Sequence, residues 1–235
     1  SGGPCTNVVQ RITFSSASNS SNVGTLTVAR AIGAGASSST HGYIAGCDNN
    51  SMWQLVWFKE QFYKHNPNAE LFVYDFDNFA NDLSGWFKKP RAMVDASFRS
   101  DRVCWLDTDM EIKDNIEDIF NFIEPNKLAM VEDHPWSIRR KEKWHNSGLV
   151  AFAGRPMILS EWAEAVDSNP DVGDQEVLHN ILRDGLKRHI HITDVPKTYN
   201  TLRLDLLDNT APNNIKIMHW TGSKGKDEIW RMIHE

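Results

Sequence analysis

The chain has 235 residues, of which 40% are hydrophobic and 24% are charged, and its net charge is −6. This composition predicts one globular domain with a sizeable core and excludes a chain that is disordered throughout. An acidic balance without a Lys/Arg cluster argues against nucleic-acid binding, and no apolar run reaches the ~18 residues of a transmembrane segment.

Three widely spaced cysteines, Cys5, Cys47 and Cys104, form no CxxC pair. This spacing predicts neither a disulfide framework nor a zinc ribbon. We therefore expect a reducing compartment, the cytoplasm, while a Golgi-type lumenal catalytic domain cut from its membrane anchor stays open as an alternative.

Residues 1–40 differ from the rest of the chain. The opening Ser-Gly-Gly-Pro resembles the remnant of an expression tag, residues 8–14 could form an edge strand, and the Ser/Gly-rich composition beyond them is typical of a linker. The GAGAS segment at 33–37 lacks both the GxGxxG spacing and the Gly-Lys-Ser/Thr ending of phosphate loops. We expect the folded domain to span residues 41–235.

Strands and helices alternate through this domain. An apolar run at 42–47, a helical period that ends at Pro67 and an apolar strand at 70–74 predict a parallel βαβ unit, with Asn50 or Ser51 as the helix N-cap. Later strands are expected at 102–106, 127–131, 148–152 and 215–218, and later helices at 91–99, 116–123, 156–166 and 174–182. Asp114 is expected to cap the second of these helices, and Gly185 to close the last. The pattern predicts a single α/β domain with a Rossmann-like, mostly parallel sheet and helices on both faces.

Ligands of such sheets bind beyond the carboxyl ends of the strands. The polar side chains expected there are Asp48 and Asn49, Asp75 and Asp77, Asp107 and Asp109, Glu132 to His134, and His219. Carboxylates and imidazoles gathered at one edge suit a divalent cation with an anionic ligand.

The Asp-x-Asp motif by itself carries no weight. The chain has 19 Asp, and random placement predicts about 1.5 such pairs, while two occur. Context favours Asp107 and Asp109, because they follow a buried-type strand and point to the same side of an extended chain. That pair predicts a shared metal ion, whereas Asp75 and Asp77 are interpreted as loop acids.

The segment from Ile217 to Lys226 is the second informative stretch. His219 ends an expected strand and can bind a metal through a neutral ring nitrogen. Gly222 gives the backbone freedom, and Lys224 or Lys226 can meet phosphate charge.

Seven segments then carry a resemblance to a known family. They are GYIAGCDNN, HNPNAELFVYDFD, KKP, RVCWLDTDMEI, WHNSGLVAF, GDQEVLHNIL and IMHWTGSKGKDEIW. In this order, and over about His41 to Trp230, the chain resembles nucleotide-sugar glycosyltransferases of the GT-A fold, in particular the retaining, glycogenin- and galactosyltransferase-like group.

The resemblance implies transfer of a sugar from a nucleotide-sugar donor, UDP-linked by the preference of the family, to a glycan or other hydroxyl acceptor. It implies that Asp107, Asp109 and His219 hold Mn²⁺ or Mg²⁺, and that Asp174 and Gln175 are catalytic residues at the donor sugar. The donor would contact Cys47, Asp48, Asn49, Lys89, Asp107, Asn146, Ser147, Gly148, Gly222, Lys224 and Lys226.

Asp174 has two interpretations of similar weight. It can cap the helix that it begins, or its carboxylate can support the oxocarbenium-like sugar. A carboxylate at a helix start is held ionised by the helix dipole, which favours electrostatic support over proton abstraction. We therefore expect front-side transfer, in which the leaving diphosphate takes the acceptor's proton.

Two other classes of protein stay open. A haloacid dehalogenase-type phosphohydrolase also uses a strand-end Asp-x-Asp pair, but on the first strand of its core domain, and with Thr or Val where Glu111 stands here. A non-catalytic nucleotide-sugar-binding module would keep the pocket without needing the metal ligands. Titration of Mn²⁺ with nucleoside diphosphates would separate these alternatives.

Overall fold

The computed structural model describes residues 8–11, 21–25, 41–80, 82–83 and 85–235. The chain divides into two units, residues 1–38 and 39–235. In the first, β1 (Val8–Arg11) pairs antiparallel with β2 (Ser21–Thr25). The strand β1 lies in the run expected to form a strand, β2 lies where a linker was expected, and the GAGAS segment falls outside the described residues.

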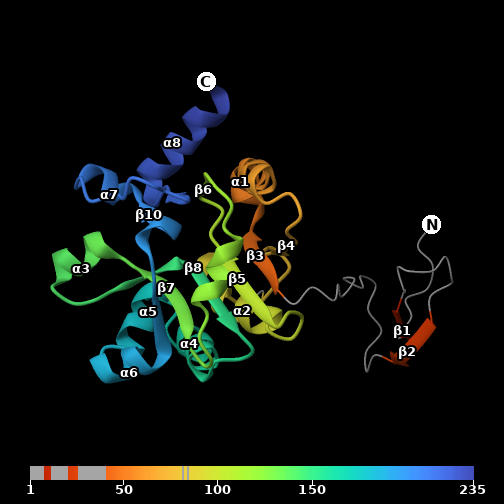
Figure 1. Ribbon diagram of the computed structural model, residues 1–235. Coiled ribbons are helices and arrows are strands. Elements are labelled where there is room, and N and C mark those ends of the chain that lie inside the picture. The colour runs from red at the N-terminus through yellow and green to blue at the C-terminus, as the bar shows by residue number, and fades with distance from the viewer. Residues whose placement is uncertain (1–7, 12–20, 26–40, 81, 84) are drawn as a thin grey trace. The chain divides into compact units, whose positions relative to one another are not determined.

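The second unit is built on a six-stranded sheet of order β4-β3-β5-β8-β7-β9 (Figure 1). The strands are β3 (His41–Cys47), β4 (Leu71–Asp75), β5 (Arg102–Leu106), β7 (Leu128–Glu132), β8 (His145–Ala153) and β9 (Ile192–Val195). Only β8 runs antiparallel to its neighbours. The sheet is therefore mostly parallel, as predicted.

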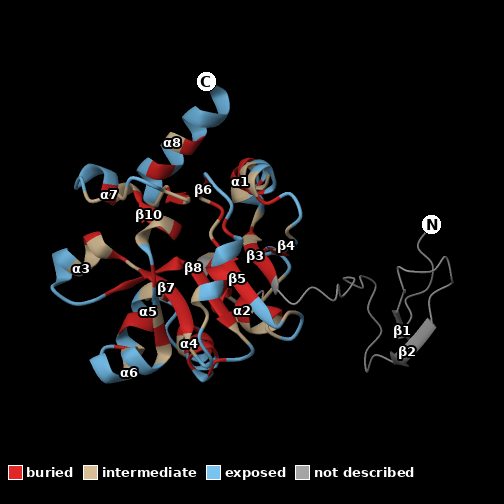
Figure 2. Ribbon diagram, viewed as in Figure 1, coloured by how far each residue is buried: buried red, intermediate tan, exposed pale blue. Residues whose placement is uncertain are grey.

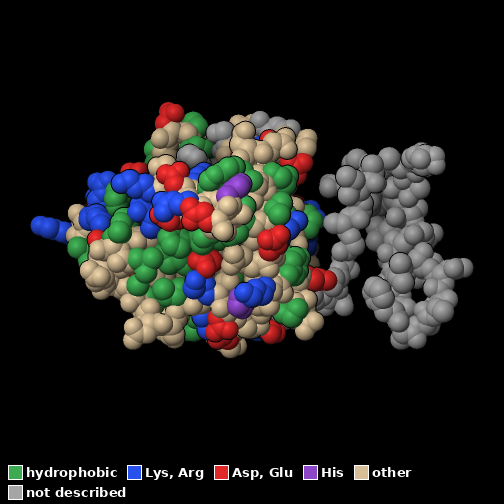
Figure 3. Space-filling view, turned by 90° about the horizontal axis from the view of Figure 1, so that it is seen from above, with side chains coloured by type: hydrophobic (Ala, Val, Ile, Leu, Met, Phe, Trp, Pro, Cys, Tyr) green, Lys and Arg blue, Asp and Glu red, His purple; other side chains and the backbone are tan. Residues whose placement is uncertain are grey.

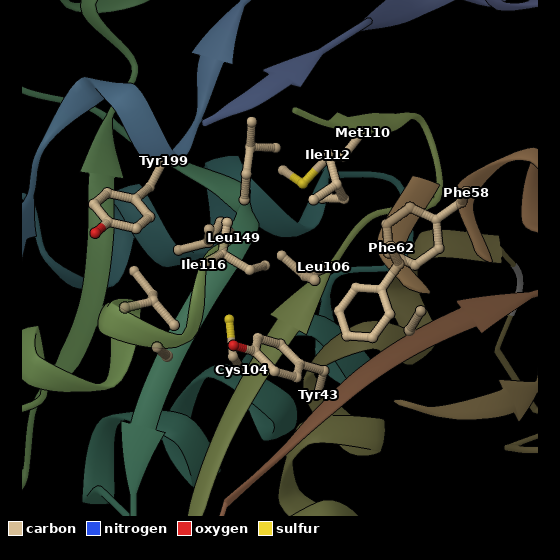
Figure 4. Close-up of a cluster of buried hydrophobic side chains, with 14 of the residues drawn as sticks. Tyr43, Phe58, Phe62, Cys104, Leu106, Met110, Ile112, Ile116, Leu149 and Tyr199 are labelled. Carbon is tan, nitrogen blue, oxygen red and sulfur yellow. The ribbon is translucent and has the colours of Figure 1, made fainter. Parts of the chain in front are cut away.

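Helices cover both faces of this sheet, because successive side chains of a strand point to opposite sides. One face packs against α1 (Met52–His65) and the other against α2 (Lys89–Ala96), α4 (Met157–Ser168) and α5 (Asp174–Ile181). Figure 2 shows the buried strands between exposed outer helix surfaces. Figure 4 shows Tyr43, Phe58 and Phe62 in the buried cluster between α1 and the sheet.

A small three-stranded sheet lies beside the main one. Its order is β10-β11-β6, with β10 at Thr201–Leu202, β11 at Ile217–His219 and β6 at Met110–Ile112. The strand β6 begins directly after Asp109, and β11 pairs with it antiparallel so that His219 lies opposite Met110. This pairing brings two segments about 110 residues apart in the chain to one edge.

The remaining elements are η1 (Asn49–Ser51), η2 (Gly85–Lys88), η3 (Glu117–Phe122), α3 (His134–Arg140), α6 (Gly185–His191), η4 (Lys197–Tyr199), α7 (Arg203–Leu207) and α8 (Gly222–His234). Of the described helices, none is both long and apolar enough to cross a membrane.

Two expectations about helices were wrong. The helix expected at 116–123 is the 3₁₀ helix η3, and its N-cap is Ile116 rather than Asp114. The other concerns Gly185, which was expected to close a helix and instead begins α6, where Asp184 accepts a hydrogen bond from the Leu186 amide at 2.9 Å.

Candidate functional site

A cavity of about 320 Å³ lies at the carboxyl ends of β3 and β5. Its lining combines residues of β3, α1, α2, the segment after β5 and α8, and includes Cys47, Asp48, Trp53, Lys89, Trp105, Asp107, Thr108, Asp109 and Lys226. In Figure 1, β6 and the start of α8 lie above the sheet, and Figure 3 views the molecule from that side. The lining of the cavity brings three carboxylates and two lysines together. Such a mixture suits a charged ligand with a counter-ion.

Asp107 and Asp109 line this cavity, and His219 lies close to both carboxylates. Their potential ligand atoms all lie within 4.8 Å of one another, and Oδ1 of Asp109 is 3.0 Å from Nε2 of His219. Both carboxylates are half-buried, while the imidazole is buried. Two carboxylates and one imidazole form a donor set that can hold a divalent cation.

The backbone fixes where the imidazole of His219 can lie. The amide of Trp220 donates to the carbonyl of Asp109 at 3.0 Å, which ties the end of β11 to the start of β6. On the other side, a Cβ atom at Gly148 would come within 2.3 Å of Cε1 of His219. Glycine is therefore required at position 148 for the imidazole to occupy this place.

A chain of hydrogen bonds sets the tautomer of His219. Oδ1 of Asn146 accepts from the amide of Gly148 at 2.9 Å, and it also accepts from Nδ2 of Asn200 at 2.9 Å. The Oδ1 atom of Asn200 then faces Nδ1 of His219 at 2.9 Å and accepts its proton. With Nδ1 protonated, the lone pair of a neutral imidazole belongs to Nε2, the atom that faces Asp109.

The electrostatics of this pair match a cation site. Burial alone would lower the pKa of His219, but Asp109 outweighs it and raises the pKa above its usual range. Asp109 keeps a pKa below its usual range, because the favourable charge of His219 overcomes burial. A divalent cation between the two side chains would take the place of the proton that they share.

Lys89 is a buried cation between two carboxylates. Its Nζ atom lies 3.0 Å from Asp107 and 3.5 Å from Oδ2 of Asp174, and donates to the carbonyl of Ser147 at 3.2 Å. Burial alone would lower the pKa of Lys89, but the two carboxylates raise it to about 12. Lys89 therefore stays charged and links Asp107 to α5.

Asp174 does not cap its helix. The N-cap of α5 is Gly173, and Asp174 is the first helical residue, with its backbone carbonyl accepting from Nε1 of Trp162 at 2.8 Å. Its buried side chain faces Lys89 instead. Of the two interpretations of Asp174, the geometry contradicts capping and leaves a carboxylate held toward the site.

Gln175 lies in a closed polar network. Its Oε1 atom accepts from the amide of Ser147 at 3.3 Å and from Nδ2 of Asn146 at 3.1 Å, while its Nε2 atom donates to Asp133 at 3.0 Å. Asp133 also accepts from Nδ2 of Asn146 at 3.3 Å. The network extends through Asn146 and Asn200 to His219 and fixes the orientation of each amide.

The loop after β3 is organised by local caps. Asp48 accepts a hydrogen bond from the amide of Ser51 at 2.9 Å and is the N-cap of η1. Burial raises the pKa of the neighbouring Cys47 thiol. Cys47 and Asp48 line the cavity, whereas the exposed Asn49 does not and donates its amide to Asp77 at 2.8 Å.

The two lysines after His219 both lie near the start of α8 (Gly222–His234). Gly222 begins this helix with φ +75°, a conformation that favours glycine. Lys226 lines the cavity, and Lys224 is exposed and outside that lining.

Sequence reasoning missed three side chains of this site. Asn200 and Trp105, whose Nε1 donates to Asp107 at 2.6 Å, were not singled out, and Asp133 was considered only as a strand-end residue. Trp105 carried a signal, since it lies two residues before Asp107 on the same side of an extended strand. The sequence around Asn200 carried no such signal.

No protein-family model matches the sequence, and a search of curated proteins finds no significant match. Solved structures do match by fold, and several glycosyltransferases are among them, which confirms the predicted GT-A fold.

The galactosyltransferase LgtC, solved with donor and acceptor sugar analogues, is 13% identical over 77% of this chain and 87% of its own, with a TM-score of 0.54. A glycosyltransferase involved in glycosylation of the major capsid of the virus PBCV-1 is 12% identical over 82% and 99%, with a TM-score of 0.59. GlyE of Streptococcus pneumoniae is 16% identical over 79% of this chain and 55% of its own, with a TM-score of 0.55.

Proposed function

We propose that the chain is a metal-dependent glycosyltransferase that moves a sugar from a UDP-linked donor to a hydroxyl acceptor with retention of configuration. The observation that carries the proposal is the convergence of Asp107, Asp109 and His219 beside the buried Lys89–Asp174 pair. The fold of the glycosyltransferases supports it. The strand β5 is the third of its domain, so the site departs from the first-strand placement of the phosphohydrolase alternative.

Asp107, Asp109 and His219 would hold Mn²⁺ or Mg²⁺, which supplies positive charge for the leaving nucleoside diphosphate when bound. Lys226, at the cavity lining, would add a second positive charge for the same group. The loop with Cys47 and Asp48 would lie against the nucleoside, as the resemblance implies. Charge that develops on the diphosphate is thereby met by groups already in place.

The sugar would lie against Asp174, Gln175 and Asn146. Asp174 is ion-paired with Lys89 rather than hydrogen-bonded to its own helix, which suits electrostatic support of an oxocarbenium-like sugar. In front-side transfer, the bond between C1 and the diphosphate oxygen breaks and a bond from C1 to the acceptor oxygen forms on the same face. The acceptor's proton goes to the diphosphate, and Gln175 with Asn146 orients the sugar.

A donor screen followed by proton NMR tests the proposal. The full chain with Mn²⁺ is incubated with a panel of UDP-sugars, and the anomeric coupling of the first product, by transfer or by hydrolysis, is recorded. We expect UDP release with the donor's anomeric configuration kept, and none from the His219→Gln variant. An inverted product would contradict the stereochemical scheme, and release that is equal in the variant would contradict the metal site.

A further inference from the structure

A second and larger cavity, about 540 Å³, lies beside the edge strand β9. It is formed by the segment before β8, the end of α5, α6 and β9, and its lining includes Glu142, Lys143, His145, His179, Arg183, Arg188, His189 and Asp194. Three of these residues are permanent cations and two are carboxylates. The cavity therefore has a positive balance in a chain whose net charge is −6.

Both carboxylates of this cavity are engaged with other side chains. Glu142 accepts from Nε2 of His179 at 2.9 Å and from Arg183 at 3.1 Å. Asp194 accepts from Nε2 of His145 at 2.8 Å and from Lys143 at 2.6 Å. Each carboxylate thus neutralises a cation at the rim, and neither pairs with Arg188.

Arg188 lines the cavity between His145 and His179, with its donors on neutral groups. Its Nη2 atom donates to the carbonyl of Leu182 at 3.0 Å and lies 3.3 Å from Nδ1 of His179. Its Nη1 atom donates to the carbonyl of Lys143 and lies 3.5 Å from Nδ1 of His145. Among the residues that the structure describes, no carboxylate lies within ion-pair distance of this guanidinium.

The two imidazoles are arranged around Arg188 in one tautomer. Each donates from Nε2 to a carboxylate, so its Nδ1 atom carries the lone pair that faces the guanidinium. Burial lowers the pKa of both His145 and His179, more than their carboxylate partners raise it, which keeps both rings neutral. The ring of His179 is held further by parallel stacking on Trp144, with centroids 3.6 Å apart.

Arg188 is therefore a partly buried cation whose charge is not compensated by direct contact. Burial lowers its pKa, and the more distant carboxylates only oppose this. A charged group taken out of water without a counter-charge is costly, and interactions in which one partner is ionised are stronger than those between neutral groups. An anionic ligand in the cavity would compensate the charge.

The cavity adjoins the proposed sugar site. His145 and Asn146 are neighbours on β8 but point to opposite sides of the strand, whereas His179 follows Gln175 by four residues on α5, which places these two side chains on one face of the helix about 6 Å apart. The helix α5 therefore contributes one residue to the cavity and, a turn earlier, one to the proposed sugar site.

We propose that this cavity binds an anionic group, a phosphate or a carboxylate, of a sugar acceptor, with Arg188 as its principal contact and Arg183 and Lys143 at the rim. That the bound molecule is an acceptor rests on the proposed function, whereas the binding of a charged sugar rests on the cavity alone. The acceptor class of the transfer is thereby identified as acidic.

Calorimetry on the metal-free full chain, without nucleotide, tests the binding. The probes are glucose 6-phosphate, glucuronate and neutral glucose. We expect at least one charged probe to bind tenfold or more tightly than glucose, and the stronger of the two identifies phosphate or carboxylate as the preferred group. Equal affinity for all three probes would overturn the proposal.

Variants locate the bound probe. Arg188→Gln should weaken binding about tenfold, and the surface variant Arg183→Gln about threefold, which keeps the test decisive if Arg188→Gln does not fold. Arg231→Gln, an exposed arginine on α8 paired with Glu228, is the charge-matched control and should bind as wild type. Loss of binding in Lys226→Gln instead of the arginine variants would place the probe in the nucleotide cavity and overturn the proposal.

This test is independent of sugar transfer. Charged-sugar binding without any UDP release in the donor screen would leave the cavity assignment intact and contradict the proposed enzyme. Transfer to neutral acceptors with no charged-sugar binding would support the proposed enzyme and contradict the assignment of the cavity.

Discussion

The two Asp-x-Asp pairs of this chain have the same sequence pattern and different surroundings. Asp75 and Asp77 follow the edge strand β4, are exposed, and accept hydrogen bonds from their own loop and from the amide of Asn49. Asp107 and Asp109 follow the central strand β5, are half-buried, and meet a buried lysine and a buried histidine.

The difference follows from position in the sheet. A pair at the end of an edge strand is solvated on one side, whereas a pair at the end of a central strand is flanked by neighbouring strands and crossing helices. The second pair has cationic and imidazole side chains within contact distance on several elements. The chemical role of an Asp-x-Asp pair therefore depends on the side chains that neighbouring elements place around it. Each variant below alters one of the two pairs or the residues around it.

The largest effect is expected for Asp109→Asn. Loss of one carboxylate charge from the metal site should lower kcat by about 10³-fold or more. The fold should survive, because the backbone carbonyl that accepts from Trp220 is retained. Steady-state UDP release checks this, with Asp75→Asn as the matched variant. Wild-type turnover in Asp109→Asn and loss in Asp75→Asn would exchange the roles of the two pairs.

Asp174→Asn should lower kcat by about 10²-fold, since a charge that supports the sugar in the transition state is removed. The affinity for UDP with Mn²⁺ should stay within about twofold, because Asp107 still pairs with Lys89. Turnover and calorimetric UDP binding are measured on the same sample. A parallel fall in UDP affinity would mean that Asp174 acts through Lys89 on the nucleotide rather than on the sugar.

Gly148→Ala tests whether the close approach of the β8 backbone positions His219. The added methyl group would lie 2.3 Å from His219 Cε1 and 2.9 Å from Asn146 Oδ1, so the imidazole must move. We expect a loss of about 1–3 kcal/mol in unfolding free energy and a Mn²⁺ affinity at least tenfold weaker. Gly185→Ala, where a methyl group meets nothing within 4 Å, is the control, and equal Mn²⁺ affinity in the two variants would contradict the positioning of His219.

The smallest effect is expected for Asp77→Asn. Its carboxylate accepts the amide of Asn49 and so orders the loop after β3, but an amide oxygen can accept the same bond. We expect kcat unchanged and KM for the donor raised no more than about threefold, as for an exposed, uniform binding contact. A fall in kcat would show that the exposed pair takes part in the chemistry.

Much of the fold was predictable, because most strands are apolar runs closed by polar residues, and the helices α1, α4 and α5 have a regular period. In the small sheet, the strand expected at 215–218 overlaps β11, whereas β6 and β10, with three and two residues, show no alternation that would predict them. The helix α6 was missed because Gly185 marks a helix end as readily as a start.

The residues of the candidate site also divide into those that the sequence predicts and those that it does not. Asp107, Asp109 and His219 could be predicted because all three stand at or just after strand ends. Asn200 could not, because it follows a 3₁₀ turn, and its role depends on Asn146 and His219, which lie 54 and 19 residues away in the chain. The basic cavity around Arg188 was also invisible, because its cations come from separate segments of the chain.

We propose that Asp107, Asp109 and His219 form a cation site that makes nucleotide binding metal-dependent. The direct measurement is a thermal shift of the full chain with UDP, in the presence of Mn²⁺ and in the presence of chelator. UDP at 100 times its Kd should stabilise the protein by about 2.7 kcal/mol, and we expect this with Mn²⁺ and little shift with chelator. Equal shifts with and without the metal, or a shift kept in His219→Gln, would contradict the account.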